Sequence, residues 1–329
     1  MALRLLEMVI PHDATASVGD LPSVNKVIER WDDQLNDKQS LVRMLVNAVD
    51  SEALLDDLEN RFSDVNGFRL ILLNVEATIP RPSVTVSETT DPATKSPERI
   101  SREEIYHDVA QGANVTHVFL AQVVIATVVA AVGLLRNDNV VIIGAMVIAP
   151  LLGPNMSLCL ATTLGDLKLA ISSLKANVTG LAVAFVVSLI VGFLFVIDPS
   201  IESIKARTQV SGGDILLALA SGTAGVLAFT SGAPAALIGV MVAVALLPPF
   251  VVFGLLVASG EFDAAKGALL LVATNVICVN LAGVLTFVAQ GLRPRTWWEA
   301  ERAKNSTRIA IATWCALLAI LALLIYGAR

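Results

Sequence analysis

Residues 141–154 of the chain read VIIGAMVIAPLLGP, and residues 236–249 read ALIGVMVAVALLPP. The two segments share a glycine, a methionine, a Leu-Leu pair and a final proline at matching positions. An acidic residue follows each segment at the same spacing, Asp166 in the first case and Glu261 in the second. Apolar sequence alone would not keep these different residue types in step, so we interpret the two segments as an internal repeat.

The repeat extends beyond these segments. After a shift of three residues, Asn177 matches Asn275. The repeated unit spans three apolar segments, and an odd number of membrane crossings turns the second unit upside down. The pattern therefore predicts a three-plus-three inverted repeat, whose halves are related by an axis in the membrane plane.

Composition divides the chain into two parts. Of the 329 residues, 55% are hydrophobic and only 16% are charged, whereas a soluble domain has about 25% charged residues. Residues 1–112 carry 20 acidic and 11 basic residues, a net charge of −9, and residues 113–329 carry 9 and 12, a net charge of +3. We therefore expect a soluble domain followed by a membrane domain.

A bilayer core requires about 20 apolar residues per helix. On this basis residues 101–329 form a helical, polytopic membrane domain with seven spans and with the lipid bilayer as its surroundings. The expected spans are 114–135, 139–163, 171–197, 213–231, 234–258, 265–290 and 309–327.

Residues 1–80 are expected to form a small α+β domain. The pattern predicts the order β-α-β-β-α-β, the ferredoxin-like or split βαβ arrangement. Its expected elements are strands at 3–10, 40–46 and 68–75, an extended piece at 33–38, and helices at 23–31 and 51–62. Residues 81–100, rich in Pro, Ser and Thr, read as a linker, and the capping-box spacing of Ser101 and Glu104 predicts a helix start.

The orientation follows from the loops. The first eleven residues contain no apolar core long enough for a secretion signal, so we expect the soluble domain to be cytoplasmic. Residues 291–308 contain five basic residues and would lie on the same side. These features predict a protein of the inner (cytoplasmic) membrane with its C-terminus outside. The soluble domain would either sense a ligand or assemble a homo-oligomer, because a fold alone does not choose between such roles.

Prolines interrupt two of the expected spans. The second span contains Pro150, Gly153 and Pro154, and the fifth contains Pro248 and Pro249. A proline removes a backbone hydrogen bond, and the freed carbonyls must face protein or a water-filled cavity. Paired interrupted helices point to a transporter binding site. The alternative is that both are simply kinked packing helices.

Polar residues near these breaks are candidates for a substrate or ion pathway. They are Gln122, Asn155, Ser157, Asn177, Asn275 and Asn280. For each one alone, hydrogen bonding between helices is the simpler explanation. Asp166 and Glu261 are expected at helix ends, and they would couple transport to a proton or cation only if they lay at depth.

The sequence offers little for catalysis. It contains no phosphate-binding glycine loop, G-x-S-x-G or H-E-x-x-H motif. The three histidines lack metal-ligand spacing, and the three cysteines all lie in apolar segments, which favours packing. The acidic first domain does not favour nucleic-acid binding. We therefore expect no enzyme activity, metal, cofactor or nucleic-acid partner.

Residues 144–166, GAMVIAPLLGPNMSLCLATTLGD, and residues 75–82, VEATIPRP, carry a family resemblance. In these motifs the chain resembles the hydrophobic multi-pass proteins grouped as domain of unknown function 389. The resemblance implies a prokaryotic multi-pass membrane protein and supplies no catalytic residues.

Three functions are compatible with these observations. The leading hypothesis is a transporter or channel-like permease for a small solute or ion, regulated or assembled by its soluble domain. The second is a membrane-anchored sensor whose soluble domain binds a small effector while its helices mainly oligomerise. The third is a structural scaffold without a ligand.

Overall fold

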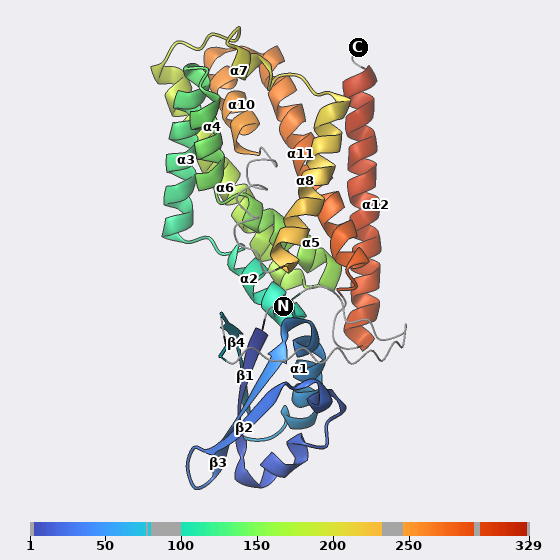
Figure 1. Cartoon of the computed structure of the whole chain (residues 1–329). Helices are drawn as coiled ribbons and strands as arrows, with labels where there is room; N and C mark the ends of the chain where they lie inside the picture. Colours follow the sequence, from blue (N-terminus) through green and yellow to red (C-terminus); the bar gives the residue numbers. More distant parts are fainter. Residues whose placement is uncertain (1–2, 77, 80–99, 232–245, 293–296, 328–329) are drawn as a thin grey trace. The chain divides into compact units, whose positions relative to one another are not determined.

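The computed structural model describes residues 3–76, 78–79, 100–231, 246–292 and 297–327 (Figure 1). It divides into two compact units, Met1–Ile105 and Tyr106–Arg329, which we describe separately. The expected linker at 81–100 lies, apart from its last residue, outside the described residues.

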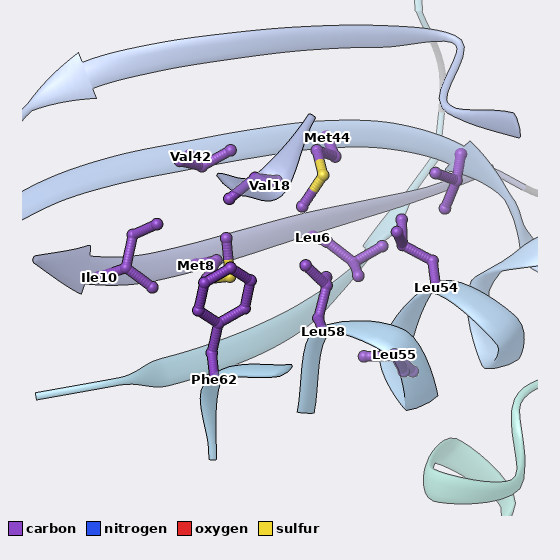
Figure 2. Close-up of a cluster of buried hydrophobic side chains, with 11 residues drawn as sticks. Leu6, Met8, Ile10, Val18, Val42, Met44, Leu54, Leu55, Leu58 and Phe62 are labelled. Atoms are coloured by element: carbon purple, nitrogen blue, oxygen red, sulfur yellow. The ribbon is translucent and has the colours of Figure 1, made fainter. Parts of the chain in front are cut away.

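The first unit is a four-stranded antiparallel sheet with the order β2-β3-β1-β4. The strands are β1 (Leu3–Pro11), β2 (Glu29–Gln34), β3 (Gln39–Asn47) and β4 (Arg69–Val75). Alternate side chains of β1 and β3 are buried, as expected of strands with one face on a core. Helix α1 (Ala48–Phe62) supplies Leu54, Leu58 and Phe62 to this core (Figure 2).

The expected helix at 23–31 is wrong. The chain between β1 and β2 forms two 3₁₀ segments, η1 (His12–Val18) and η2 (Pro22–Lys26), and β2 then begins at Glu29. Val27 and Ile28 are β-branched and favour extended backbone. The ladder between β2 and β3 then replaces the weak local helix preference.

Helix α2 (Arg102–Gln111) begins where the capping box predicted. The Ser101 hydroxyl accepts a hydrogen bond from the Glu104 backbone N–H at 3.3 Å. In the same first unit, the Arg4 guanidinium of β1 binds both carboxylate oxygens of Glu104, at 3.0 and 2.8 Å. The helix start is therefore held by a cap and by a largely buried ion pair.

The second unit is entirely helical where it is described (Figure 1). Five of its helices are long and apolar enough to cross a membrane, and the bent pair α4–α5 would add a sixth span. The fifth expected span, 234–258, falls partly outside the described residues, and its second half is α10. The helices are α3 (His117–Leu135), α4 (Asn139–Ile148), α5 (Leu152–Leu164), α6 (Leu167–Leu194), α7 (Glu202–Lys205), α8 (Gly212–Thr230), α10 (Leu247–Ser259), α11 (Phe262–Ala289) and α12 (Trp297–Gly327).

The helix boundaries recur at a constant interval. Helices α8, α10 and α11 begin and end 95 positions after α3, α5 and α6 respectively. Both α5 and α10 end at a glycine in the left-handed region, Gly165 (φ 72°) and Gly260 (φ 82°). Each half-length helix packs against the long helix of the other set, α5 on α11 and α10 on α6.

Candidate functional site

The second expected span is broken at the predicted place. Helix α4 ends at Ile148, α5 begins at Leu152, and the two are bent by 49°. Pro150 lies in the break, and Pro154 lies in the first turn of α5. Pro248 and Pro249 likewise lie in the first turn of α10. A first-turn N–H has no partner within its own helix, so a proline there starts a helix without losing a bond.

A cavity of about 400 Å³ lies beside the start of α10. It lies at the end of the second unit where α3 ends and α8 begins, and we call this the α7 end (Figure 1). The opposite end, where α3 begins and α5 ends, is called the α2 end. Its lining residues are Asn137, Asn139, Glu202, Ser203, Ala206, Arg207, Asp214, Leu217, Ala218, Pro249, Leu271 and Asn275. Asn275 stands at the midpoint of α11, so the cavity extends from the loops to the middle of the bundle.

Side chains from the α7 segment form the mouth of this cavity. The backbone N–H of Ser203 donates to Asn137 Oδ1 at 3.0 Å, and its hydroxyl donates to the Leu134 carbonyl at 2.9 Å. These bonds fasten α7 to the end of α3. Asp214 accepts two hydrogen bonds from Ser211, at 2.7 Å each, in the capping box of α8.

Among the described residues of the cavity lining, Arg207 is the one cation. Its Nη1 donates to the Ser203 carbonyl at 2.5 Å, and burial lowers the pKa of its guanidinium. Within the described ranges, no carboxylate lies within 4 Å of the guanidinium nitrogens. The side chain therefore keeps its charge without a salt bridge and can offer donors to a polar solute.

Three of the predicted asparagines form one cluster in the interior. Asn155 Nδ2 donates to Asn177 Oδ1, and Asn280 Nδ2 donates to Asn155 Oδ1, both at 2.9 Å. The cluster joins α5, α6 and α11, and Asn155 and Asn280 are 3% and 0% exposed. Their amides also donate to the Leu151 and Val276 carbonyls. The cluster therefore holds these helices together and does not line the cavity.

The remaining predicted residues are placed separately. Asn275 lines the cavity, whereas Gln122 is exposed on α3 and belongs to neither group. The Ser157 hydroxyl donates to the Val109 carbonyl of α2. The three cysteines are free; Cys159 and Cys278 are buried, and Cys315 is exposed on α12.

The two acidic candidates occupy helix starts. Asp166 caps α6 by accepting from the Leu169 N–H at 3.0 Å, and it also accepts from the Tyr106 hydroxyl at 2.7 Å. This hydrogen bond is the main reason why the pKa of Tyr106 is raised to about 12. Glu261 takes the matching position before α11 without a side-chain cap.

The helix boundaries recur at a constant interval of 95 residues, so no three-residue shift is needed between the two segments. Asn177 and Asn275, which were matched through that shift, are therefore not equivalent positions. At 95 positions, Asn155 corresponds to Phe250 and Asn280 corresponds to Phe185. The rings of Phe185 and Phe250 lie 6.3 Å apart, and Phe253 stacks on Phe185 at 5.2 Å. The contact between α5 and α11 is thus polar, while its counterpart between α10 and α6 is aromatic.

Sequence reasoning missed the polar cavity residues outside the spans, namely Asn137, Glu202, Ser203 and Arg207. Their only signal was a set of polar residues in the loops at one end of the bundle. The short helix α7, which contains Ser203 and ends two residues before Arg207, has no distinct sequence pattern.

Taken together, the apolar spans, the broken helix and the interior cavity define a multi-pass membrane protein with half-length helices. Residues 146–281 match the family model described as "Domain of unknown function (DUF389)". The chain is also 34% identical over 328 residues to "Uncharacterized protein MJ0678" of Methanocaldococcus jannaschii, covering 99% of this chain and 100% of that relative. The chain belongs to the DUF389 family. No solved structure matches it.

Proposed function

We propose that this protein is a transporter or channel-like permease for a small solute or ion, built on a three-plus-three inverted repeat. The recurring helix boundaries support the repeat, with α3 to α6 as one unit and α8 to α11 as the other. Each unit would contain one full span, one broken span and one long span. Such folds commonly place their substrate site at the broken helices, near the bilayer midplane.

Two close helix contacts also support the repeat. A Cβ at Gly283 would lie 2.6 Å from Cys159 Sγ, and a Cβ at Gly254 would lie 2.4 Å from Ser188 Cβ. Gly254 is the counterpart of Cys159, and Gly283 is the counterpart of Ser188. The same two positions therefore meet in both halves, and in each contact one partner is glycine so that the backbones can approach.

The functional proposal rests mainly on the cavity at the α7 end. It joins one end of the bundle to Pro249 and Asn275, near the middle, and it is lined by amide, hydroxyl and charged groups. In lipid, polar groups and interrupted backbone at such depth are expected to face protein or water. A polar cavity that ends at the start of the half-length helix α10 would suit the entry of a small polar solute.

The charge distribution supports an assignment of sides. With the first unit in the cytoplasm, the α7 end faces the exterior and the protein lies in the inner membrane. The first unit, a ferredoxin-like sheet with 3₁₀ segments replacing one helix, would then regulate or assemble the transporter from inside.

The test is flux into proteoliposomes that contain the full chain, measured for a panel of small ions and polar solutes. Asn275→Leu removes a polar group from the cavity. Its matched control is Thr274→Val, since the hydroxyl of the adjacent Thr274 donates to the Leu270 carbonyl of its own helix, at 2.8 Å. We expect one solute to move faster than in protein-free vesicles, and Asn275→Leu alone to reduce that rate. Equal rates in the two variants, or no flux above protein-free vesicles, would refute the proposal.

A further inference from the structure

We infer that the solute pathway has a second vestibule at the α2 end, lined by Pro154, Ala176 and Gly180 and closed in this structure by Phe119 and the last turn of α2. The inference rests on the proposed function and deepens it, because it identifies the residues through which the same solute would leave. It follows from comparing the two ends of the second unit position by position.

The cavity at the α7 end has a defined counterpart. Its deep lining residues are Pro249, Leu271 and Asn275. The residues 95 positions earlier in the chain are Pro154, Ala176 and Gly180. Leu217 is another lining residue, and the residue 95 positions before it is Gln122. The polar Gln122 on α3, which belongs to neither the cavity nor the asparagine cluster, thus falls at a pathway position.

The space is filled at the α2 end. Asp214, half-exposed at the cavity wall, corresponds to Phe119, whose side chain is 6% exposed. A Cβ at Gly180 would lie 3.1 Å from Phe119 Cζ and 3.1 Å from Leu151 Cδ2. The aromatic ring and the leucine therefore occupy the volume that is open beside Asn275 at the other end.

Helix α2 completes the closure. The Val109 carbonyl accepts a hydrogen bond from Ser157, and the Ala113 carbonyl accepts one from Ser172 at 3.0 Å. A Cβ at Gly112 would lie only 2.9 Å from Gly153 Cα, so the two backbones touch at the helix break. The end of α2 thus lies directly against the break that starts α5.

Helix α7 is the counterpart of this closing segment. Its residues Glu202–Lys205 fall 95 positions after residues 107–110, which belong to α2. Arg207 corresponds to Gly112 and lines the open cavity, whereas Gly112 lies against Gly153. Each end therefore has a helix before the first span of its repeat. The four-residue α7 lies in an open position, and the ten-residue α2 lies in a closed one. If α2 moved to its open position while α7 moved to its closed one, the solute site would open to the other side of the membrane. This is alternating access.

The test measures whether water reaches the second vestibule when α2 is displaced. In a full chain whose three cysteines are replaced by alanine, Ala176→Cys places a thiol at a position that is 0% exposed. A membrane-impermeant cationic methanethiosulfonate is applied to sealed vesicles from the α2 side. Gly112→Ala must push α2 away from Gly153, and its control is Gly144→Ala, where a Cβ meets nothing within 4 Å.

With Gly112→Ala the labelling rate should rise about tenfold, the change expected if a minor open state grows from about 1% to about 10% of the molecules. Tyr106→Phe is a milder release, since it removes only the hydrogen bond to Asp166. It should raise the rate in the same direction by a smaller factor, and it keeps the test valid if Gly112→Ala does not fold.

A thiol from Asn275→Cys, probed from the α7 side, separates the two proposals. Suppose this thiol is labelled, but the Ala176→Cys thiol reacts no faster with Gly112→Ala or Tyr106→Phe than with the Gly144→Ala control. The second vestibule is then refuted, and the cavity at the α7 end stands. If Asn275→Cys is itself unreactive, the cavity does not admit water and the proposed function fails with it.

Discussion

The asparagine cluster gives a quantitative test of how the broken helix is held. Replacing Asn280 by leucine leaves the buried Asn155 Oδ1 without its donor. An unsatisfied buried polar atom costs about 1–3 kcal/mol, and interhelical hydrogen bonds in membranes reach about 1.7 kcal/mol. Leucine recovers little by burial, because lipid is as apolar as the helix interface. We expect Asn280→Leu to lower the free energy of unfolding by about 1.5 kcal/mol.

The double variant Asn155→Leu with Asn280→Leu isolates the interaction. It removes donor and acceptor together, so it should cost less than the sum of the single variants by about 1–2 kcal/mol. The assay is reversible unfolding of the purified protein in mixed detergent micelles. Thr274→Val, which loses only a bond within α11, is the control and should change stability little. Strictly additive single variants would show that the amide contact contributes nothing to stability.

Three further predictions concern other contacts. Gly283→Ala should destabilise the protein by about 1–3 kcal/mol through overpacking against Cys159, and Cys159→Ala should recover most of this loss in thermal unfolding. Because the folded pKa of Tyr106 is raised from 10.0 to about 12, its contribution to stability is complete below pH 10 and lost as the pH rises through about 12. The absorbance difference between wild type and Tyr106→Phe, measured during an alkaline titration, should show a phenol that ionises at a pH well above 10. Ionisation near pH 10 would contradict this. Arg4→Met should cost about 3 kcal/mol by leaving its carboxylate partner on α2 unpaired, seen as faster hydrogen exchange along β1 in the full chain; unchanged exchange would show that the pair is not stabilising.

Local patterns predicted most of the elements. The strands β1, β3 and β4 followed from alternating apolar residues, and α1 followed from helical spacing. The break between α4 and α5 followed from Pro150, whose effect on the backbone is local. Residues 23–31 were mispredicted as a helix, because the extended form of their second half depends on the pairing of β2 with β3, which no local pattern contains.

The candidate site was predicted only in part. Asn155, Asn177 and Asn280 were expected either to line a pathway or to bond between helices. The sequence could not show that these three bond to one another while Asn275 lines a cavity. Asn155 and Asn280 are 125 positions apart, and their contact depends on the rotation of two helices about their axes. Arg207 was missed because its role comes from a loop that folds over the cavity.

The sequence by itself indicated a multi-pass membrane protein with two segments of similar pattern and an interrupted helix in the first. Hydropathy, repeat spacing and proline positions are properties of the chain that any fold must respect. Only the tertiary structure decided that a cavity lies beside the start of α10 while Phe119 packs near Gly180. It also decided that Asn155 bonds to Asn280 while Phe185 packs against Phe250. The physical reason is that packing depends on which side chains meet across helices, and equivalent positions in the two halves carry residues of different size and polarity.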